Sequence, residues 1–374
     1  MQQCCPQKTG DCMEFDSFPA YSGSIVQLAW GILNRYGVCA PGPVPQALAR
    51  HFAHPPRNTV LFLLDGLGGN ILEKHLPSDS FLRRNQTDML RSVFPPTTAA
   101  AATALETGRY PSQSGWLGWS IYWPPMDKNV ALYPNTDDQG RPASPVHIGR
   151  TYLPVTPLTR QLPGVTACSA SEAGAVTLED AAALAGQLCR EPGQHFLYAY
   201  LNEPDHTLHR EGCDSQAVGE FLTRADAILA QLRDSCPDTL FLLTADHGFT
   251  DVQGLCLEDF PALADTLARQ PSIEPRAMNL FLKPGRQEDF LRHWQAAMGD
   301  SYTLYTHQQV LDKALFGPGP NHPMLEAMVG DYLAVARTPL TLFPNRGYRD
   351  AMVATHGGLT PQELSVPLVV WKSH

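Results

Sequence analysis

Three short apolar runs in this sequence pass directly into polar residues, and this repetition constrains the fold more than any other feature. Such runs, bounded by turn-forming residues, predict buried strands. They cover Val60–Leu64, Phe196–Leu201 and Leu240–Leu243, and they are followed by Asp65, by the segment 202–205 and by Asp246-His247-Gly248. In an open sheet of parallel strands, ligands bind outside the carboxyl ends of the strands. We therefore expect these polar residues to converge on one crevice.

Helical patterns lie between the apolar runs and predict the class of fold. Helices are indicated by apolar residues at three- and four-residue spacing and by an alanine-rich run that closes with a glycine. They cover Thr98–Glu106, Leu178–Leu188 and Ala217–Leu232, and a fourth apolar run, Val366–Trp371, predicts another strand. Alternating strands and helices favour a mostly parallel central sheet with helices on both faces. The expected fold class is therefore α/β.

Two long stretches interrupt this alternation and define the expected domains. Residues 116–163 are rich in Trp, Tyr, Pro, Asn and Asp and are too long for an ordinary loop, so they predict a lid insertion. Residues 254–348 contain a helical pattern at Glu288–Met298 and strand-like pieces at Asn279–Leu282 and Tyr332–Ala336, which predict a small α+β subdomain. The remainder is expected to form an N-terminal extension with a helix (1–50) and the main core (51–253 and 349–374).

The charge balance argues against some classes of partner. The 374 residues include 27 Lys and Arg against 37 Asp and Glu, a formal charge of −10. Such a chain would repel nucleic acid polymers and anionic membrane surfaces, so we expect neither as a partner. No stretch reaches the roughly 18 apolar residues that span a bilayer, and the first residues do not resemble a signal peptide. The expected location is the cytoplasm, and the sequence does not indicate an oligomeric state.

The cysteines favour the same compartment. There are nine, an odd number, and most stand singly, which fits reduced thiols better than a disulfide framework. Cys4, Cys5 and Cys12 form a cluster that could bind a metal, but no second Cys or His pair follows at the spacing of a zinc finger. An ordinary N-terminal segment is the favoured interpretation.

Carboxylates and imidazoles occur in pairs at two of the predicted strand ends. Asp205 and His209 are four residues apart, so a helical turn would place them on one face, close enough to share a metal ion. Asp246 and His247 follow a strand, and Gly248 would allow a bend that lets both side chains reach a common centre. Each pair alone also fits a solvated helix or a hydrogen-bonded turn.

Two further residues extend this set. Asp65 ends a strand and is followed by glycines at positions 66, 68 and 69, while His356 precedes Gly357-Gly358. The glycine segment lacks the Gly-Lys-Ser/Thr of a phosphate-binding P-loop and the spacing of a dinucleotide fingerprint. With the two pairs above, the chain offers three carboxylates and three imidazoles, a mixed ligand set that suits two zinc-like ions.

A threonine pair stands at the start of the alanine-rich helix. Two prolines precede Thr97 and Thr98, which forces extended backbone, and the alanine run then begins a helix. Either threonine could simply be the N-cap. Alternatively, one hydroxyl could attack phosphorus while the helix N-terminus favours negative charge. One threonine can cap the helix while the other reacts.

Five segments in order resemble the alkaline phosphatase superfamily, and most closely its type I phosphodiesterase/nucleotide pyrophosphatase branch. They are LLDGLG, FPPTTAAAATALETGRYPSQSG, YLNEPDHTLHREG, TADHGF and THGG. The resemblance implies an alkaline-phosphatase-like core. It also implies two metal sites, the first formed by Asp65, Thr98, Asp246 and His247 and the second by Asp205, His209 and His356. Thr98 resembles the family nucleophile because it stands nine residues before Thr107-Gly108.

The sequence departs from the family at two positions. The diesterases often carry Thr-Phe-Pro-Asn at the nucleophile, whereas Ala101 occupies the position of that Asn, so an amide donor is expected to be missing. The usual His of Tyr-Pro-x-x-His-Gly is Ser114. The Cys/Ser-x-Pro-x-Arg signature of sulfatases is absent. The metal positions are retained, and the substrate is left open.

The expected function is metal-dependent hydrolysis of phosphate esters, as a phosphodiesterase or nucleotide pyrophosphatase acting on a small phosphorylated substrate. Two divalent ions, Zn²⁺ or else Mn²⁺ or Fe, would activate Thr98, which would form a covalent phospho-threonine intermediate. A phosphomonoesterase or phosphonate hydrolase would use the same site. Two alternative functions lie outside the hydrolases. One is a phosphomutase, and the other is a metal-stabilised module that binds phosphorylated ligands without turnover.

Aromatic residues open the 116–163 insertion. Trp116, Trp119 and Tyr122, with Trp123, could stack on a nucleobase or another flat group of the substrate. They could equally form a small hydrophobic core of the insertion. We favour the core, because at least two of these side chains must pack inward.

Overall fold

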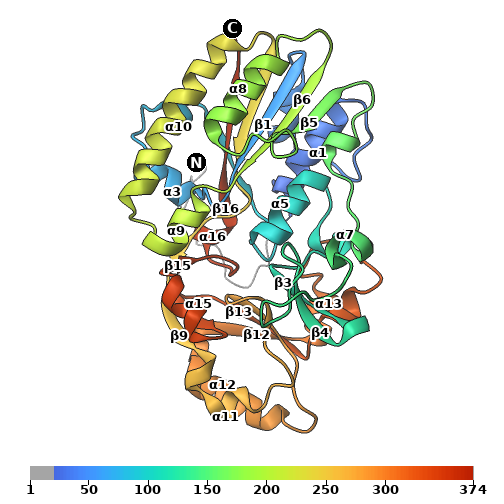
Figure 1. Ribbon diagram of the computed structural model, residues 1–374, viewed down its shortest axis with the longest axis vertical. Helices are drawn as coiled ribbons and strands as arrows, with labels where there is room; N and C mark the ends of the chain where they lie inside the picture. Colours follow the sequence, from blue (N-terminus) through green and yellow to red (C-terminus); the bar gives the residue numbers. More distant parts are fainter. Residues whose placement is uncertain (1–20, 374) are drawn as a thin grey trace, which may run out of the picture.

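The computed structural model describes residues 21–373 and shows two six-stranded sheets, one above the other in Figure 1. Cys4, Cys5 and Cys12 lie outside the described residues. The central sheet has the strand order β2-β16-β7-β1-β6-β5. Its strands are β1 (Asn58–Leu64), β2 (Gln86–Arg91), β5 (Thr166–Ser169), β6 (His195–Leu201), β7 (Thr239–Thr244) and β16 (Ser365–Lys372).

The central sheet is mostly parallel, as the sequence predicts. β5, β6, β1 and β7 run parallel, while β16 pairs antiparallel with both β7 and β2. All seven residues of β1 are buried, which explains its continuous apolar run, because helices cover both faces of a parallel sheet. The pairs Leu64–Leu201 and Leu63–Thr244 align the ends of β6, β1 and β7. The α/β class is confirmed.

Two groups of helices cover the central sheet (Figure 1). One face carries α1 (Ile25–Arg35) packed against α5 (Thr98–Thr107). The other face carries α3 (Gly69–His75), α4 (Phe81–Arg84), α8 (Leu178–Leu188) and α10 (Gln216–Ser235). The alanines of α5 favour a helix, and Gly108 ends it with φ of +70°, a left-handed conformation that glycine adopts readily.

The second sheet is antiparallel and has the order β12-β13-β11-β10-β3-β4. Its strands are β3 (Ser120–Trp123), β4 (Lys128–Ala131), β10 (Ser272–Glu274), β11 (Ala277–Leu280), β12 (Tyr302–Thr306) and β13 (Tyr332–Ala336). Alternate residues face opposite sides: Leu333 and Val335 join one apolar cluster, and Tyr332 and Ala334 join the other. Helices α11 (Pro261–Ala264) and α12 (Gln287–Met298) contribute to the second of these clusters.

The lid insertion and the α+β subdomain expected from the sequence share this second sheet. Ser120 of the 116–163 stretch pairs with Ile273 of the 254–348 stretch, which joins β3 to β10. The apolar cluster on that side also includes Phe94 and Ala99, which flank the threonine pair. The two stretches therefore build one layer, and this layer packs against the start of α5. The proposed domain boundaries remain a prediction.

Short elements connect the two sheets. β8 (Thr250–Asp251) pairs with β15 (Ala354–Thr355), and β9 (Gln253–Cys256) pairs with β14 (Leu340–Phe343). The remaining helices are α2 (Gln46–Ala49), α6 (Pro111–Ser114), α7 (Ile148–Tyr152), α9 (Asp205–Glu211), α13 (His307–Asp312), α14 (Leu325–Met328), α15 (Arg346–Ala351) and α16 (Pro361–Leu364). None of the helices in the described part of the chain has the length and apolar character to cross a membrane.

Candidate metal centre and active site

Three acidic loops meet at the carboxyl ends of β1, β6 and β7. The backbone N–H of Asp65 donates to Leu201 O (2.9 Å), and the N–H of Asp205 donates to Asp65 O (3.0 Å). The carboxylate of Asp246 accepts the N–H of Gly66 (3.2 Å) through Oδ1. The loops approach closely, since a Cβ added to Gly68 would lie 2.7 Å from the Cα of Gly248. The convergence expected from the sequence is present.

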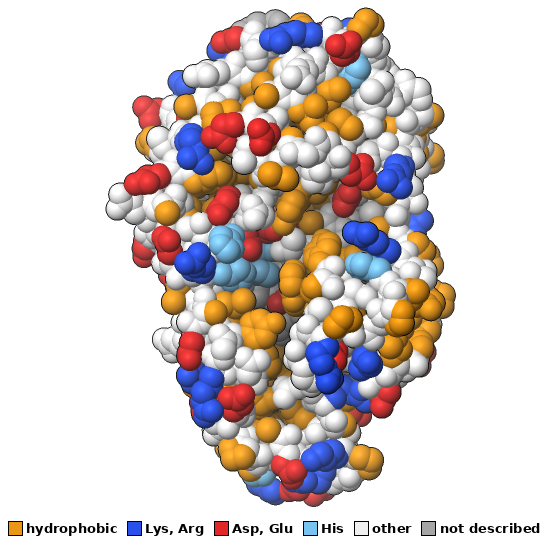
Figure 2. Space-filling model, viewed as in Figure 1, with side chains coloured by type: hydrophobic (Ala, Val, Ile, Leu, Met, Phe, Trp, Pro, Cys, Tyr) orange, Lys and Arg blue, Asp and Glu red, His pale blue; other side chains and the backbone are white. Residues whose placement is uncertain are grey.

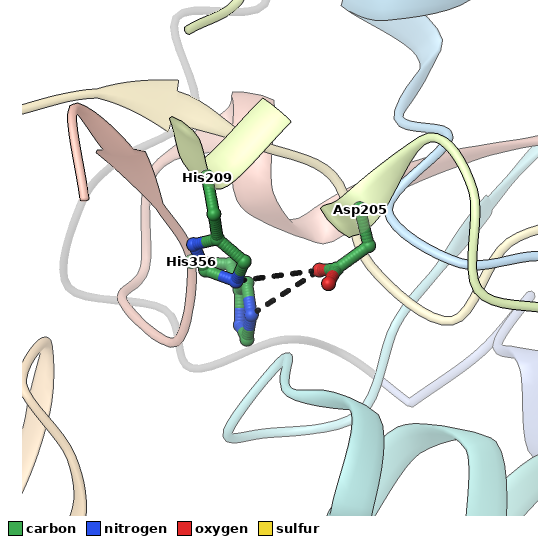
Figure 3. Close-up of side chains that lie close together, drawn as sticks. All are labelled: Asp205, His209 and His356. Carbon is green, nitrogen blue, oxygen red and sulfur yellow. Dashed lines mark ion pairs between the residues drawn. The ribbon is translucent and has the colours of Figure 1, made fainter. Parts of the chain in front are cut away.

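Asp205, His209 and His356 form one compact group (Figure 3). Asp205 and His209 lie on α9, and His356 follows β15. The Nε2 atom of His209 is 3.5 Å from Asp205 Oδ1, and that of His356 is 3.7 Å from the same oxygen. Their potential ligand atoms lie within 4.8 Å of one another. A single ion could contact all three side chains.

Asp65, Asp205 and His247 form a second group that shares Asp205 with the first. His247 Nε2 lies 3.3 Å from Asp65 Oδ1, 4.0 Å from Asp205 Oδ1 and 3.6 Å from Asp246 Oδ2. Asp246 therefore borders this group, where the family resemblance placed it. Asp205 lies between the two groups and could contact an ion in either.

All three histidines present the same nitrogen to the carboxylates. The Nδ1 atoms of His209, His247 and His356 contact the carbonyl oxygens of Ala354 (3.0 Å), Gly248 (3.2 Å) and Pro96 (3.0 Å). A carbonyl oxygen only accepts, so each Nδ1 carries the hydrogen and each neutral Nε2 carries a lone pair. This is the usual orientation of metal-binding imidazoles.

The site contains lone pairs that a metal cation would satisfy. Lone pairs on Nε2 face carboxylate oxygens, which also carry lone pairs and repel them. Asp205 Oδ1 and Asp246 Oδ2 are buried and accept no hydrogen bond from the described residues. An unsatisfied buried carboxylate oxygen is costly. The residues present therefore fit divalent metal ions with mixed imidazole and carboxylate ligation.

The pKa values reflect the crowding of these groups. Burial raises the pKa of Asp65 to about 6 and that of Asp246 to about 7, and the neighbouring Asp65 charge adds to the shift at Asp246. Burial and the same two carboxylates raise the pKa of Asp205. Burial lowers the pKa of His209 to about 4 and also lowers that of His356. The protein alone thus disfavours the charged forms, and a bound cation would favour the ionised carboxylates.

Thr98 is the first residue of α5 and lies beside the second group. Its Oγ1 is 3.4 Å from Asp65 Oδ1 and 3.2 Å from His247 Nε2. Thr97 occupies the N-cap position but makes no side-chain cap, because its hydroxyl donates to Glu274 Oε1 (2.5 Å) instead. The N-terminal N–H groups of α5 therefore remain available to an anion beside the Thr98 hydroxyl.

A cavity of about 670 Å³ opens onto this centre. Thr97, Thr98, Asp205, His209 and His356 lie at one end, and residues of both insertions form the remaining walls. The lining contains four further carboxylates but no lysine or arginine: Asp137, Asp138, Glu258 and Glu274. Figure 2 shows the pale blue imidazoles beside a hollow midway along the molecule. Without a bound metal, the cavity lining contains carboxylates and no lysine or arginine to balance them.

The description of the family model that matches the chain is type I phosphodiesterase/nucleotide pyrophosphatase, and the matched segments are residues 59–155 and 121–358. Together they cover most of the chain and every residue of the two groups. The chain belongs to this phosphodiesterase family. Curated relatives include ectonucleotide pyrophosphatase/phosphodiesterase family member 1 of rat, 27% identical over 58% of this chain, and the human protein, 27% identical over 55%. These alignments span only 26% and 24% of the relatives' own lengths.

Solved structures share the fold. Mouse ectonucleotide pyrophosphatase/phosphodiesterase 5 superposes with a TM-score of 0.64 at 16% identity, covering 83% of this chain and 87% of that one. Phosphonoacetate hydrolase from Sinorhizobium meliloti 1021, in complex with phosphonoacetate, gives a TM-score of 0.60 at 16% identity, covering 85% and 91%. The fold is therefore that of the alkaline phosphatase superfamily, as the sequence motifs indicate.

The aromatic residues expected near the substrate divide into two kinds. Trp116 is buried, donates from Nε1 to Leu153 O (3.0 Å), and does not line the cavity. Tyr122 also lies outside the lining, where its ring packs under the Arg269 guanidinium. Trp119 is 41% exposed and does line the cavity. Of the three, only Trp119 is positioned to touch a ligand there.

Ala101 does not take the place that its alignment with the phosphodiesterase family suggested. It is fully buried within the main apolar cluster and is not among the cavity-lining residues. A side chain at this position would point into the core of the central sheet. The expectation that Ala101 removes a donor from the site is therefore wrong.

Glu274 is a cavity residue that the sequence reasoning missed. It ends β10, and its Oε1 accepts the Thr97 hydroxyl and the backbone N–H of Trp119 (3.1 Å). The preceding Ile273 has φ of +77°, a strained conformation for a β-branched residue and one that is enriched at functional sites. The tetrapeptide Ser272–Pro275 matches no motif. The signal that could have identified it is the three-dimensional proximity of Thr97, which lies 177 residues away.

Proposed function

We propose that this protein hydrolyses phosphodiesters by attack of Thr98 at a two-metal site. The observation that carries the proposal is the position of the Thr98 hydroxyl. It lies within 3.5 Å of both Asp65 and His247, at the N-terminus of a helix that has no side-chain cap, and it faces a cavity large enough for a small ester. Membership of the phosphodiesterase family supports the reaction class.

Asp65, Asp246, His247 and Thr98 would hold one ion, and Asp205, His209 and His356 would hold the other. Mixed imidazole and carboxylate ligands suit Zn²⁺, and Mn²⁺ or Fe accepts the same donors. When bound, two such ions would lower the pKa of the attacking hydroxyl and neutralise charge on the leaving oxygen. The orientations of the three imidazoles support this assignment, as do the two buried carboxylate oxygens that accept no hydrogen bond from the described residues.

The residues of the chain have separate roles in this scheme. Thr98 Oγ1 forms a bond to phosphorus as the bond to the leaving alkoxide breaks, which gives a phospho-threonine and one free alcohol. Asp65 Oδ1, which lies 3.4 Å from the Thr98 hydroxyl, would accept its proton. The N–H groups at the start of α5 would hold a phosphoryl oxygen. Water then attacks phosphorus from the side of the departed alcohol and releases Thr98 with a phosphomonoester product.

The cavity favours a diester over more highly charged substrates. A diester carries one negative charge at neutral pH, whereas a monoester, a pyrophosphate or a phosphonate with a carboxylate carries more. With no lysine or arginine in the lining, only the metal and the N–H groups at the start of α5 would offset the extra charge. The ligands of the solved relatives are a phosphomonoester and a phosphonate: an inactive threonine-to-alanine variant of the mouse member 5 protein was solved with AMP, and the Sinorhizobium hydrolase with phosphonoacetate.

One panel tests the reaction class. Zinc-reconstituted protein would be assayed against bis-p-nitrophenyl phosphate, a p-nitrophenyl nucleotide ester and p-nitrophenyl phosphate. We expect the two diesters to be hydrolysed with the higher kcat/KM. The reverse ranking would favour the phosphomonoesterase alternative. For a substrate whose alcohol stays bound, ¹⁸O-labelled water distinguishes hydrolysis, which incorporates the label, from a phosphomutase, which does not.

A further inference from the structure

We propose that Cys189 and Cys236 form an oxidisable dithiol, which a small hydroperoxide converts to a disulfide that stabilises the fold. The two residues lie outside the metal centre and its cavity, so the inference does not depend on the proposed phosphodiesterase function. Both cysteines are free, and each is only 1% exposed. The inference depends on the contact between their thiols and on the charged groups around one of them.

Hydrogen bonds bring the two cysteines together at the amino ends of the central strands. Cys189 is the C-cap of α8 and Cys236 is the C-cap of α10, and these two helices pack against each other. The side-chain amide of Asn58, the first residue of β1, donates to Cys189 O (3.2 Å) and to Pro237 O (3.4 Å). One amide group therefore bridges the ends of the two helices.

The two side chains point toward each other. The Cys236 thiol donates a hydrogen bond to the sulfur of Cys189. A second link between the helix ends holds this arrangement, because the Arg190 guanidinium donates to Ser235 O (3.2 Å). Two thiols in hydrogen-bond contact need little movement to reach the geometry of a disulfide.

The surroundings make Cys189 the more reactive of the two thiols. The hydrogen bond from Cys236 lowers the pKa of Cys189 to about 7 despite burial, and Thr239, Arg57 and Arg190 contribute to the shift. The same hydrogen bond, together with burial, raises the pKa of Cys236. Because the thiolate is the nucleophilic form of cysteine, Cys189 would attack first and Cys236 would stay protonated until the second step.

The oxidation takes two steps. The Cys189 thiolate attacks one oxygen of the hydroperoxide, the O–O bond breaks, and the departing alkoxide or hydroxide takes up a proton while Cys189 becomes a sulfenic acid. The sulfur of Cys236 then attacks the sulfenic sulfur, the S–O bond breaks, and the Cys236 proton leaves with the hydroxide as water. Two electrons thus pass from the two thiols to the peroxide. Both cysteines are buried beside exposed residues of the chain, Arg190 and Pro237, which favours a small oxidant over a bulky disulfide.

The disulfide would close a loop that carries part of the metal centre. Between the two cysteines lie β6, α9 and α10, and α9 provides Asp205 and His209. The cysteines themselves lie near the first residue of β1, a seven-residue strand that spans roughly 20 Å and ends at Asp65. Loop closure lowers the entropy of the unfolded chain, so we expect a more stable protein.

Peptide mapping tests for the cross-link in the zinc-loaded full chain, after treatment with hydrogen peroxide and alkylation of the remaining thiols. Digestion with trypsin and Asp-N gives peptides 180–190 and 234–237, which contain Cys189 and Cys236 and no other cysteine. We expect these two peptides to be linked, and a phosphine reductant to separate them. The exposed Cys39 reports that the oxidant has acted. Oxidation of Cys39 without the linked peptides would overturn the inference.

Variants separate the roles of the two thiols. In Cys236→Ser, the sulfenic acid on Cys189 lacks a partner thiol, so dimedone should label it about tenfold more than in the wild-type protein. Cys189→Ser should leave Cys236 unlabelled, because its thiol stays protonated. Cys256→Ser, at a buried cysteine outside the pair, is the matched control and should retain the linked peptides. Equal dimedone labelling of wild type and Cys236→Ser would contradict the assigned roles.

Thermal denaturation tests the consequence for stability. The oxidised wild-type protein should melt about 3 °C or more above the reduced protein. Cys189→Ser and Cys236→Ser should show no such rise after the same treatment, whereas Cys256→Ser should show it. A cross-linked wild-type protein that melts at the temperature of the reduced form would overturn the stabilising role of the disulfide.

Discussion

The two sheets contribute different things to one cavity. The central parallel sheet supplies the groups that can react or hold metal, because Asp65, Asp205 and Asp246 all follow strands that end at the same edge. The antiparallel sheet supplies walls, including Ser272 and Glu274 of β10. We therefore expect the chemistry and the substrate selection to depend on separate layers. This division allows the substrate to change while the reaction is retained.

Removal of the Thr98 hydroxyl should have the largest effect, because it deletes the proposed nucleophile of the central layer. For Thr98→Ala we expect kcat on the best diester to fall by about 10³-fold or more, with the melting temperature and the bound metal little changed. Thr97→Ala, which removes the neighbouring hydroxyl, should stay within about tenfold of wild type. Retention of more than about a tenth of wild-type kcat by Thr98→Ala would contradict the assignment.

Substitution of the shared carboxylate tests whether the central layer holds two ions. Because Asp205 borders both groups, Asp205→Asn should weaken both sites, whereas His356→Ala should weaken only one. Elemental analysis after dialysis against dilute zinc should give about two ions for wild type, fewer for His356→Ala and fewest for Asp205→Asn. Asp214→Asn, at an exposed carboxylate paired with Lys74, is the control. Equal zinc content in all four proteins would refute the two-site arrangement.

Breaking the link between the layers should destabilise the whole protein. Arg276, between β10 and β11, forms a buried bidentate ion pair with Glu363 of α16, at 2.6 and 2.8 Å. Glu363→Gln leaves the guanidinium without its counter-charge and should cost roughly 3–5 kcal/mol in the free energy of unfolding. Denaturant unfolding measures this change, and Asp265→Asn, which breaks an exposed pair, should leave the free energy nearly unchanged.

The same ion pair gives a pH dependence of known sign. The charge and hydrogen bonds of Arg276 hold the pKa of Glu363 below its ordinary value despite burial. A carboxylate with a lowered folded-state pKa stabilises the protein fully above its unfolded pKa, about 4.3, and loses this stabilisation as the pH falls below it. The destabilisation caused by Glu363→Gln should therefore shrink under acidic conditions. A difference that stays constant down to pH 3 would contradict this account.

The smallest effect on the kinetics is expected from a substitution in the cavity wall, at Trp119. Trp119 contributes an exposed ring to the cavity. Trp119→Ala should raise KM about three- to tenfold while kcat stays nearly constant, because ring contacts bind ground state and transition state alike. Steady-state kinetics on the best diester measure both constants. A fall in kcat with unchanged KM would instead place Trp119 in the chemistry of the central layer.

The central layer could be predicted from the sequence because each strand and the functional residue that follows it are adjacent in the chain. Val60–Leu64 and the other apolar runs fall within the observed strands, and each is followed at once by its polar residue. Parallel topology then brings Asp65 and Asp246 together without any knowledge of side-chain contacts. The fold class is confirmed, and the structure places all seven predicted metal and nucleophile positions around one centre.

The antiparallel layer could not be predicted in this way because its decisive contacts are long-range. Nothing in the sequence indicates that Ser120 pairs with Ile273, or that Glu274 lies beside Thr97. The aromatic residues of the 116–163 stretch are similar as sequence, yet Trp116 packs inside and Trp119 remains exposed. These outcomes depend on strand register, which one sequence without a turn signal does not specify.

The pairing of β3 with β10 also bears on how specificity could be exchanged between relatives. A chimera that received only residues 116–163 would contain β3 without β10, the strand that it pairs with here. Ser120 would then have to pair with a strand of the host protein in place of Ile273. An exposed or mismatched strand edge invites aggregation. The two insertions are separated by the 90 residues 164–253, yet their strands pair in one sheet, so a graft intended to move the substrate preference must carry both.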